Sequence, residues 1–130
     1  MANLDMPVPS RILVSEQKDA LNMEYQGDVR FQLPAEYLRV FSPSAEVRGH
    51  GKGQEVLHTG KRHVGIQALE KSGNYAIRIT FSDGHDTGIF SWDYLFELGT
   101  NHTDNWANYL QRLHDAGESR DPDVQVVKLS

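Results

Sequence analysis

Two stretches of alternating apolar and polar residues, each broken by a short glycine-containing turn, constrain the fold of this chain most. In the first, the apolar residues lie on both sides of Gln26-Gly27-Asp28; they are Leu21, Met23, Tyr25, Val29, Phe31 and Leu33. In the second, the turn at 71–74 separates Val64, Ile66 and Ala68 from Tyr75, Ile77, Ile79 and Phe81. Such alternation around a short turn is typical of a β-hairpin with one buried face. The pattern therefore predicts two antiparallel hairpins.

Three segments show the signals of helices. Pro34 suits the first position of a short helix, because its missing N–H would be unpaired there. Ser91 is a good N-cap for a helix that ends near Gly99. After Asp104, apolar residues recur at i, i+3, i+4 and i+7 until Gly117, which predicts a third helix. A short strand at 86–90 completes the pattern.

We therefore expect a single α+β domain over residues 1–130, in which an antiparallel sheet of two hairpins plus a short strand packs with about three helices. Its core is expected at about 12–117, between a flexible N-terminal arm and a flexible C-terminal tail. The apolar face of the strand from Tyr75 to Phe81 is expected to be covered by side chains of the last two helices: Trp92, Leu95, Trp106, Tyr109, Leu110 and Leu113. We also expect Tyr75, Phe81, Phe90, Trp92 and Trp106 to be core aromatics.

Composition excludes several kinds of protein. The 130 residues contain no cysteine, so disulfides, thiolate metal sites and cysteine nucleophiles are ruled out. The formal net charge of −5 argues against nucleic acid or an anionic membrane as a partner. The first residues have neither the basic nor the apolar region of a signal peptide, and no apolar run approaches the roughly 18–20 residues of a membrane helix. We expect a cytoplasmic protein.

The stretch Asp83-Gly84-His85-Asp86 is the main candidate for chemistry, because it places a histidine between two carboxylates. A metal needs three or four ligands that converge, and the turn offers His85, Asp83 and Asp86. The structural interpretation is that Asp-Gly forms a tight turn and His85 bonds to its backbone. The alternatives are a zinc or iron site completed by a loop histidine, such as His50 or His58, and a small hydrolase or lyase that uses the same cluster.

The segment from 42 to 62 is a long loop with four glycines, and loops of this length are often functional. Between Arg48 and His63, four cations stand against the single acid Glu55: Arg48, Lys52, Lys61 and Arg62. The loop is therefore basic on an otherwise acidic chain. We expect these four residues to bind an unidentified, acidic protein partner.

Three motifs together have a recognisable order. They are Leu-Pro-Ala-x-x-Leu-Arg at 33–39, Tyr-Ala-Ile-Arg-Ile at 75–79, and Ser-Asp-Gly-His-x-Thr-Gly-Ile-Phe-Ser-Trp-x-Tyr-Leu at 82–95. Residues 21–47 and 73–99, which contain them, resemble the γ-butyrobetaine hydroxylase-like N-terminal domain. This resemblance implies a small bacterial domain of unknown function. The same domain precedes the catalytic domain of certain iron- and 2-oxoglutarate-dependent dioxygenases and is fused to P-loop ATPases that carry iron–sulfur clusters.

The resemblance also explains the histidine in the turn. In the dioxygenases this domain binds a structural zinc through three cysteines and one histidine. The histidine corresponds to His85, and the cysteine positions fall at Ser42, Ser44 and Val47. Serine is a poor zinc ligand and valine is none, so we expect no cofactor, zinc included.

The resemblance carries over no catalytic residue. In the dioxygenases the catalytic iron lies in a separate downstream barrel, for which the residues after Gly99 leave no room. We therefore expect a protein that is not an enzyme. Its expected role is that of an accessory or protein-interaction domain linked to iron–sulfur or metal-dependent assemblies, with metal binding through His85 as the alternative.

Overall fold

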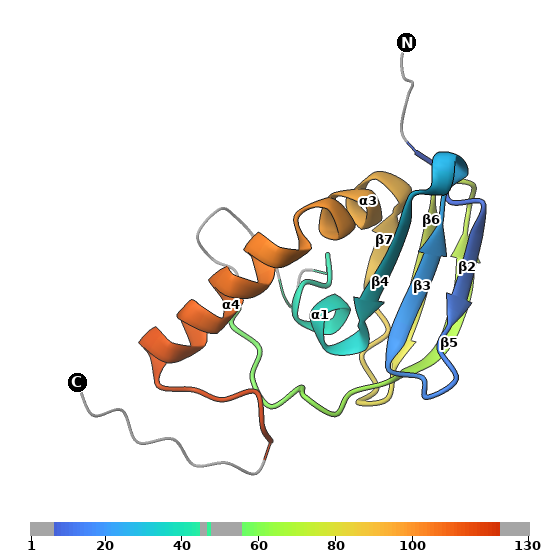
Figure 1. Ribbon diagram of the computed structural model, residues 1–130. Helices are drawn as coiled ribbons and strands as arrows, with labels where there is room; N and C mark the ends of the chain where they lie inside the picture. The colour runs from blue at the N-terminus through green and yellow to red at the C-terminus, as the bar shows by residue number, and fades with distance from the viewer. Residues whose placement is uncertain (1–6, 45–46, 48–55, 123–130) are drawn as a thin grey trace.

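The computed structural model describes residues 7–44, 47 and 56–122. It shows an α+β fold with two three-stranded antiparallel sheets and three α-helices (Figure 1). The first sheet has the order β2-β3-β4, formed by Arg11–Val14, Ala20–Glu24 and Arg30–Pro34. The second has the order β5-β6-β7, formed by Ile66–Ser72, Ala76–Phe81 and Ile89–Ser91. The helices are α1 (Ala35–Val40), α3 (Trp92–Thr100) and α4 (His102–Ala116).

Both predicted hairpins are confirmed. Strands β3 and β4 pair from Ala20↔Pro34 to Glu24↔Arg30, and the short 3-10 turn η1 (Gln26–Asp28) connects them. Strands β5 and β6 pair up to Ser72↔Ala76. The hairpins lie in separate sheets because each one pairs with its own third strand. Strand β7, which we predicted, pairs with β6, whereas the four residues of β2, which pair with β3, were too short a pattern to predict.

One core lies between the two sheets, which face each other in Figure 1. Its buried residues come from strands β3 to β7 and from helices α1 and α3; they include Leu21, Met23, Leu33, Tyr37, Leu38, Ile66, Ile77, Ile79, Phe81, Phe90, Leu95 and Leu98. Each large apolar side chain buried in this way stabilises the fold by roughly 1.5–3 kcal/mol. Helix α3 begins at the predicted cap, where the Ser91 hydroxyl accepts from the Tyr94 N–H.

The predicted packing of α4 on β6 is wrong. Tyr109 and Leu113 instead form a second cluster with Val40 of α1, while Leu110 is 40% exposed. Tyr75, predicted as a core aromatic, is 70% exposed. The physical reason is that α3 already covers the sheet, so α4 runs on beside α1 (Figure 1). In the described ranges, no helix has the length and apolar character needed to cross a bilayer.

The described part of the predicted C-terminal tail pairs with the segment before β5. The N–H groups of Gly60 and Arg62 donate to the carbonyls of Ser119 and Arg120, respectively, and both N···O distances are 3.0 Å. Arg120 forms a two-pronged ion pair with the buried Glu36 of α1, at 2.7 and 2.8 Å. Its guanidinium also lies 5.0 Å from the Trp106 ring centre. Residues 119–120 therefore belong to the packed structure.

Candidate functional site

The turn after β6 directs His85 into the protein. The turn closes because the Phe81 N–H donates to the His85 carbonyl and the Gly84 N–H donates to the Phe81 carbonyl, each over 2.9 Å. Gly84 has a φ of +92°, which an L side chain rarely adopts. The tight turn predicted from Asp83-Gly84 is thus present. His85 is only 7% exposed.

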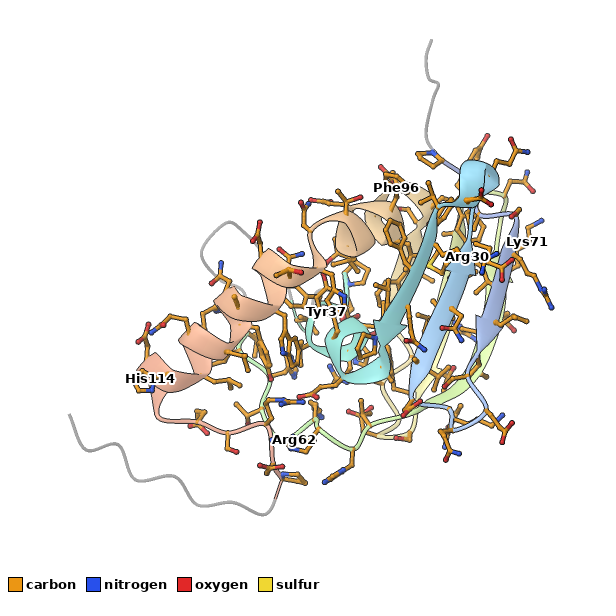
Figure 2. The ribbon with its side chains drawn as sticks, viewed as in Figure 1. Arg30, Tyr37, Arg62, Lys71, Phe96 and His114 are labelled. Atoms are coloured by element: carbon orange, nitrogen blue, oxygen red, sulfur yellow. The ribbon has the colours of Figure 1, made fainter. Side chains whose placement is uncertain are left out.

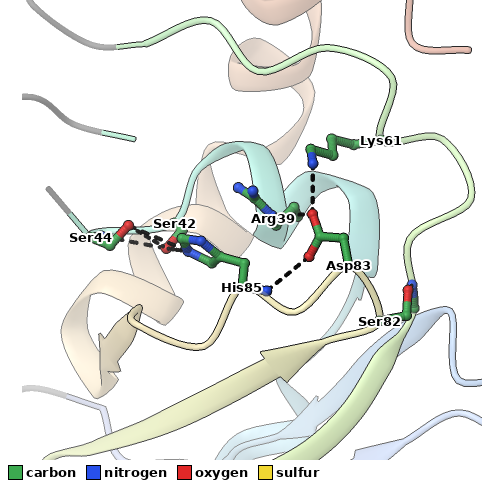
Figure 3. A network of polar contacts seen from close by, with 8 residues as sticks. Arg39, Ser42, Ser44, Lys61, Ser82, Asp83 and His85 are labelled. Carbon is green, nitrogen blue, oxygen red and sulfur yellow. Dashed lines mark hydrogen bonds and ion pairs between the residues drawn. The ribbon is translucent and has the colours of Figure 1, made fainter. Parts of the chain in front are cut away.

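The His85 ring meets the segment that follows α1 (Figure 3). Its Nε2 atom lies 2.9 Å from the Ser42 hydroxyl and 3.4 Å from the Ser44 hydroxyl, and the two hydroxyls are 3.4 Å apart. Val47 is also buried, and its N–H donates to the Ser44 carbonyl over 3.1 Å. The four positions that the family resemblance assigns to zinc ligands are therefore buried in one region of the fold; we call them the four-position cluster.

The spacing of this cluster is close to that of a zinc site, but its donor atoms are not. Zinc bonds of about 2.0–2.3 Å in a tetrahedron separate neighbouring ligand atoms by roughly 3.3–3.8 Å. The distances among Nε2 and the two hydroxyls are 2.9, 3.4 and 3.4 Å. Two neutral hydroxyls and a valine are nevertheless not zinc ligands. The residues present therefore do not fit the metal, and hydrogen bonds join the segments instead.

Gly88 makes room for this contact. A Cβ atom at Gly88 would lie 2.3 Å from the Ser42 hydroxyl oxygen, far inside van der Waals contact. The glycine of the motif Thr-Gly-Ile-Phe thus permits the chain after the turn to pass directly beside Ser42.

Asp83 lies between two cations rather than beside the imidazole. Its Oδ2 atom is 2.8 Å from Arg39 Nε and 2.7 Å from Lys61 Nζ, and its Oδ1 accepts from the His85 backbone N–H over 3.2 Å (Figure 3). Burial alone would raise the pKa of this carboxyl, but the hydrogen bonds from Lys61, the His85 N–H and Arg39 outweigh it and lower the pKa to about 2. Asp83 is therefore a charged anchor for α1 and the 56–62 segment.

The three proposed metal ligands in the turn do not converge. The Nε2 atom of His85 faces the serines, Asp83 faces Arg39 and Lys61, and Asp86 is exposed. Among the described residues, no group of three or more His, Asp or Glu side chains is arranged to hold a metal. His58 is described, and its carbonyl accepts from the Tyr109 hydroxyl over 2.7 Å. His50 lies outside the described residues.

Two of the four proposed partner-binding residues are described, and both form ion pairs within the chain. Lys61 pairs with Asp83, and Arg62 pairs with Asp121. Lys61 is 22% exposed and Arg62 is 40% exposed. Arg48 and Lys52 lie outside the described residues.

The sequence predicted no role for Arg39, and it predicted Asp83 as a residue of the tight turn or as a metal ligand. The signal was present, because Arg39 ends the motif Leu-Pro-Ala-x-x-Leu-Arg and Asp83 begins Asp-Gly-His. Their pairing became visible only in the structure. Arg39 is 6% exposed, and its Nη1 atom is buried without a hydrogen-bond partner.

The fold and the site together define a small α+β domain in which a buried histidine joins the turn after the central strand to the segment after the first helix. Residues 12–96 match the family model described as γ-butyrobetaine hydroxylase-like, N-terminal, and the chain belongs to this family. This confirms the resemblance inferred from the three motifs.

Solved structures agree with this assignment. Two proteins studied by NMR in solution are similar to this chain. The first has 51% identity and a TM-score of 0.81, and the match covers 95% of this chain and 98% of the other. The second has 41% identity and a TM-score of 0.78, and the match covers 100% of this chain and 98% of the other. A crystal structure of a protein of unknown function from Acidithiobacillus ferrooxidans, of the DUF971 family, has 32% identity and a TM-score of 0.57 and covers 72% of this chain and 92% of its own. None of the curated proteins matches the chain.

Proposed function

We propose that the protein is a non-catalytic accessory domain of the cytoplasm that binds another protein. The observation that supports this is the four-position cluster, in which hydrogen bonds join the two segments that zinc joins in the dioxygenases. The architecture is kept while the metal ligands are replaced. In this proposal, the fold around the four-position cluster supports a surface that binds another protein. The family resemblance suggests partners among iron–sulfur or metal-dependent assemblies.

A serine beside a histidine is also the pair used by nucleophilic enzymes. Here the Ser42 residue has a relative exposure of 0%, and its hydroxyl lies between the His85 Nε2 atom at 2.9 Å and the Ser44 hydroxyl at 3.4 Å. The nearby Asp83 carboxylate bonds the backbone N–H of His85, and its other oxygen holds two cations. These contacts favour a structural role for the cluster.

The surface that we propose for the partner is the basic loop, defined as Arg48, Lys52, Lys61 and Arg62. Its described residue Lys61 lies beside the Asp83 turn, where it pairs with the Asp83 carboxylate. An acidic partner complements the loop, because opposite surface charges steer association. Of the two described residues of the loop, Arg62 can be changed with the smaller effect on stability, since exposed ion pairs such as Arg62–Asp121 contribute only about 0–1 kcal/mol.

The test compares two triple charge reversals. Arg48, Lys52 and Arg62 are changed to Glu in one variant, with Lys61 kept because it holds Asp83. Arg11, Arg30 and Lys71 are changed to Glu in the matched control; Figure 2 shows Arg30 and Lys71 on the sheets, far from Arg62. Partners captured by the tagged wild-type protein are identified by mass spectrometry, and the Kd of each purified partner is measured for all three proteins.

We expect the basic-loop variant to bind at least about tenfold more weakly than wild type while the control variant binds normally. Equal weakening in both variants would mean that net charge, and not this surface, governs capture. Unchanged binding in both variants would remove the basic loop as the docking surface. Melting temperatures close to wild type confirm that each variant is folded.

A further inference from the structure

A cavity of about 300 Å³ lies between α1, α3 and α4. Among the described residues, its lining combines the apolar side chains of Val40, Phe41, Val47, Val56 and Leu98 with the polar groups of Ser42, Tyr94, Glu97, Asn105 and Arg112. This volume is at the lower end of the range of small-molecule sites, about 300–1,000 Å³. At the roughly 30 Å³ that one water molecule takes in the liquid, the cavity has room for about ten non-hydrogen atoms. That is the size of a short aliphatic molecule.

Several polar groups at the cavity already have partners inside the protein. The Tyr94 hydroxyl donates to the Phe41 carbonyl over 2.6 Å, and the Asn105 amide donates to the Tyr37 hydroxyl over 3.0 Å. Arg112 and Glu97 differ from them, because neither side chain forms a hydrogen bond or ion pair with another described residue. These two charged groups are therefore the ones that a bound molecule would meet.

The two charges are not equally accessible to water. Arg112 is half-buried, whereas Glu97 is exposed. A half-buried charge interacts more strongly with a partner than an exposed one, because the surroundings screen it less. The guanidinium also matches the two oxygens of a carboxylate with a pair of parallel hydrogen bonds. The cavity thus combines an apolar part of its lining with one half-buried cation suited to a carboxylate.

We propose that this cavity binds a small carboxylate with a short aliphatic body, whose carboxylate pairs with Arg112 and whose methylenes contact Val40, Val47 and Leu98. This proposal does not depend on the proposed protein partner. Val47 and Ser42 both belong to the cavity lining and to the four-position cluster. A molecule bound in the cavity would therefore lie next to the residues that contact His85.

The proposal predicts how affinity depends on the ligand. Each buried methylene adds about three- to fourfold to the binding constant, so hexanoate is expected to bind roughly tenfold more tightly than butanoate. Hexanol has the same body without the charge and is expected to bind more weakly than hexanoate. Hexylammonium carries the opposite charge and is expected to be the weakest of the six-carbon ligands, because it meets Arg112.

The experiment titrates the full chain with these four ligands and follows the amide signals of Ser42, Val47, Leu98 and Arg112 by NMR. It is repeated with Arg112→Gln and Glu97→Gln, and with Arg11→Gln on the exposed strand β2 as the matched control. Arg112→Gln is expected to weaken hexanoate binding at least about fivefold without weakening hexanol binding. Glu97→Gln is expected to tighten hexanoate binding, because it removes a like charge, and Arg11→Gln is expected to change nothing.

Four results would overturn the proposal. If hexanol bound as tightly as hexanoate and Arg112→Gln left hexanoate binding unchanged, the cavity would bind aliphatic molecules without recognising their charge. Tighter binding of hexylammonium would show that Glu97 dominates. The absence of saturable shifts at these four residues with every ligand would show that the cavity takes no aliphatic ligand. A shared weakening of hexanoate and hexanol in Arg112→Gln would count against it as well, because it would mean that the variant had disturbed the cavity walls.

Discussion

The Nε2 atom of His85 lies 2.9 Å from the hydroxyl of Ser42, and this contact joins two segments that are 43 residues apart in the chain. Ser44 adds a second hydroxyl at 3.4 Å. Whether the imidazole donates or accepts depends on its tautomer, and a hydroxyl can serve either one. The corner between the turn after β6 and the segment after α1 is therefore held by a bond that requires no metal.

Removal of the Ser42 hydroxyl should destabilise the protein. In Ser42→Ala, the buried ring nitrogen loses its 2.9 Å contact, and the loss of a partner by a buried polar atom costs about 1–3 kcal/mol. The free energy of unfolding is measured by urea denaturation. Thr100→Ala, at the exposed end of α3, is the matched control and should change stability by less than about 0.5 kcal/mol. A loss no larger than that of the control would contradict the proposed importance of the contact.

Restoring the family's ligands should create a zinc site. The triple variant Ser42→Cys, Ser44→Cys and Val47→Cys supplies three thiolates near His85; the present spacing of positions 42, 44 and 85 is near that of a tetrahedral site, and Val47 is buried beside Ser44. We expect about one zinc per chain in this variant and a higher melting temperature with zinc than with a chelator, because a metal that binds only the folded state stabilises it.

The control for this experiment adds His85→Ala to the triple variant. We expect this fourfold variant to bind zinc much more weakly, because a ligand is lost. The wild-type chain is measured beside both and is expected to contain no stoichiometric zinc. Stoichiometric zinc in the wild type would contradict our conclusion that its donor atoms do not fit the metal.

Removal of the Asp83 carboxylate should destabilise the protein, because this carboxylate neutralises the buried cation of Arg39. Arg39 has only 7% side-chain exposure, and a buried charge that loses its partner costs up to about 3–5 kcal/mol. We expect Asp83→Asn to lose about 2–3 kcal/mol, since Asp83 itself is 23% exposed. Glu70→Gln breaks the exposed pair of Glu70 with Arg78 and should cost at most about 0.5 kcal/mol. Similar losses in the two variants would argue against the anchor.

The same carboxylate should make stability depend on pH. Its pKa is lowered from 3.8 to about 2 in the folded protein, so its contribution is fully present above the unfolded pKa and is lost as pH falls toward 2. With allowance for partial exposure, we expect this to account for about 1 kcal/mol between pH 5 and pH 2. The wild type should lose this amount more than Asp83→Asn over that range. Parallel pH profiles for the two proteins would disprove the assignment.

The orientation of α4 can be tested with two leucines that are three residues apart. Leu113 is 4% exposed and lies in the cluster with Val40 and Tyr109, whereas Leu110 is 40% exposed. Leu113→Ala should cost about 2–4 kcal/mol, because it leaves a cavity, and Leu110→Ala less than about 1 kcal/mol. A larger loss for Leu110 than for Leu113 would mean that α4 presents the opposite face.

Short-range patterns in the sequence determined the elements of this protein. Period-two alternation predicted both hairpins, Ser91 predicted the start of α3, and Asp83-Gly84 predicted the turn that carries His85. These signals act between residues close in the chain, where backbone geometry and side-chain spacing decide the local structure. The three motifs likewise identified the family, because motif order is a property of the sequence alone.

Only the tertiary structure decided which of these elements meet. It divided the hairpins into two sheets, packed α4 against α1 instead of β6, and left Tyr75 exposed. It also paired Arg39 with Asp83 and placed Ser42 against His85. The physical reason is that an apolar stripe or a charge specifies that it needs a partner but not which one. The choice among partners distant in the chain depends on the shape of the whole core. It also depends on residues without a Cβ atom, such as Gly88, which let two segments approach each other.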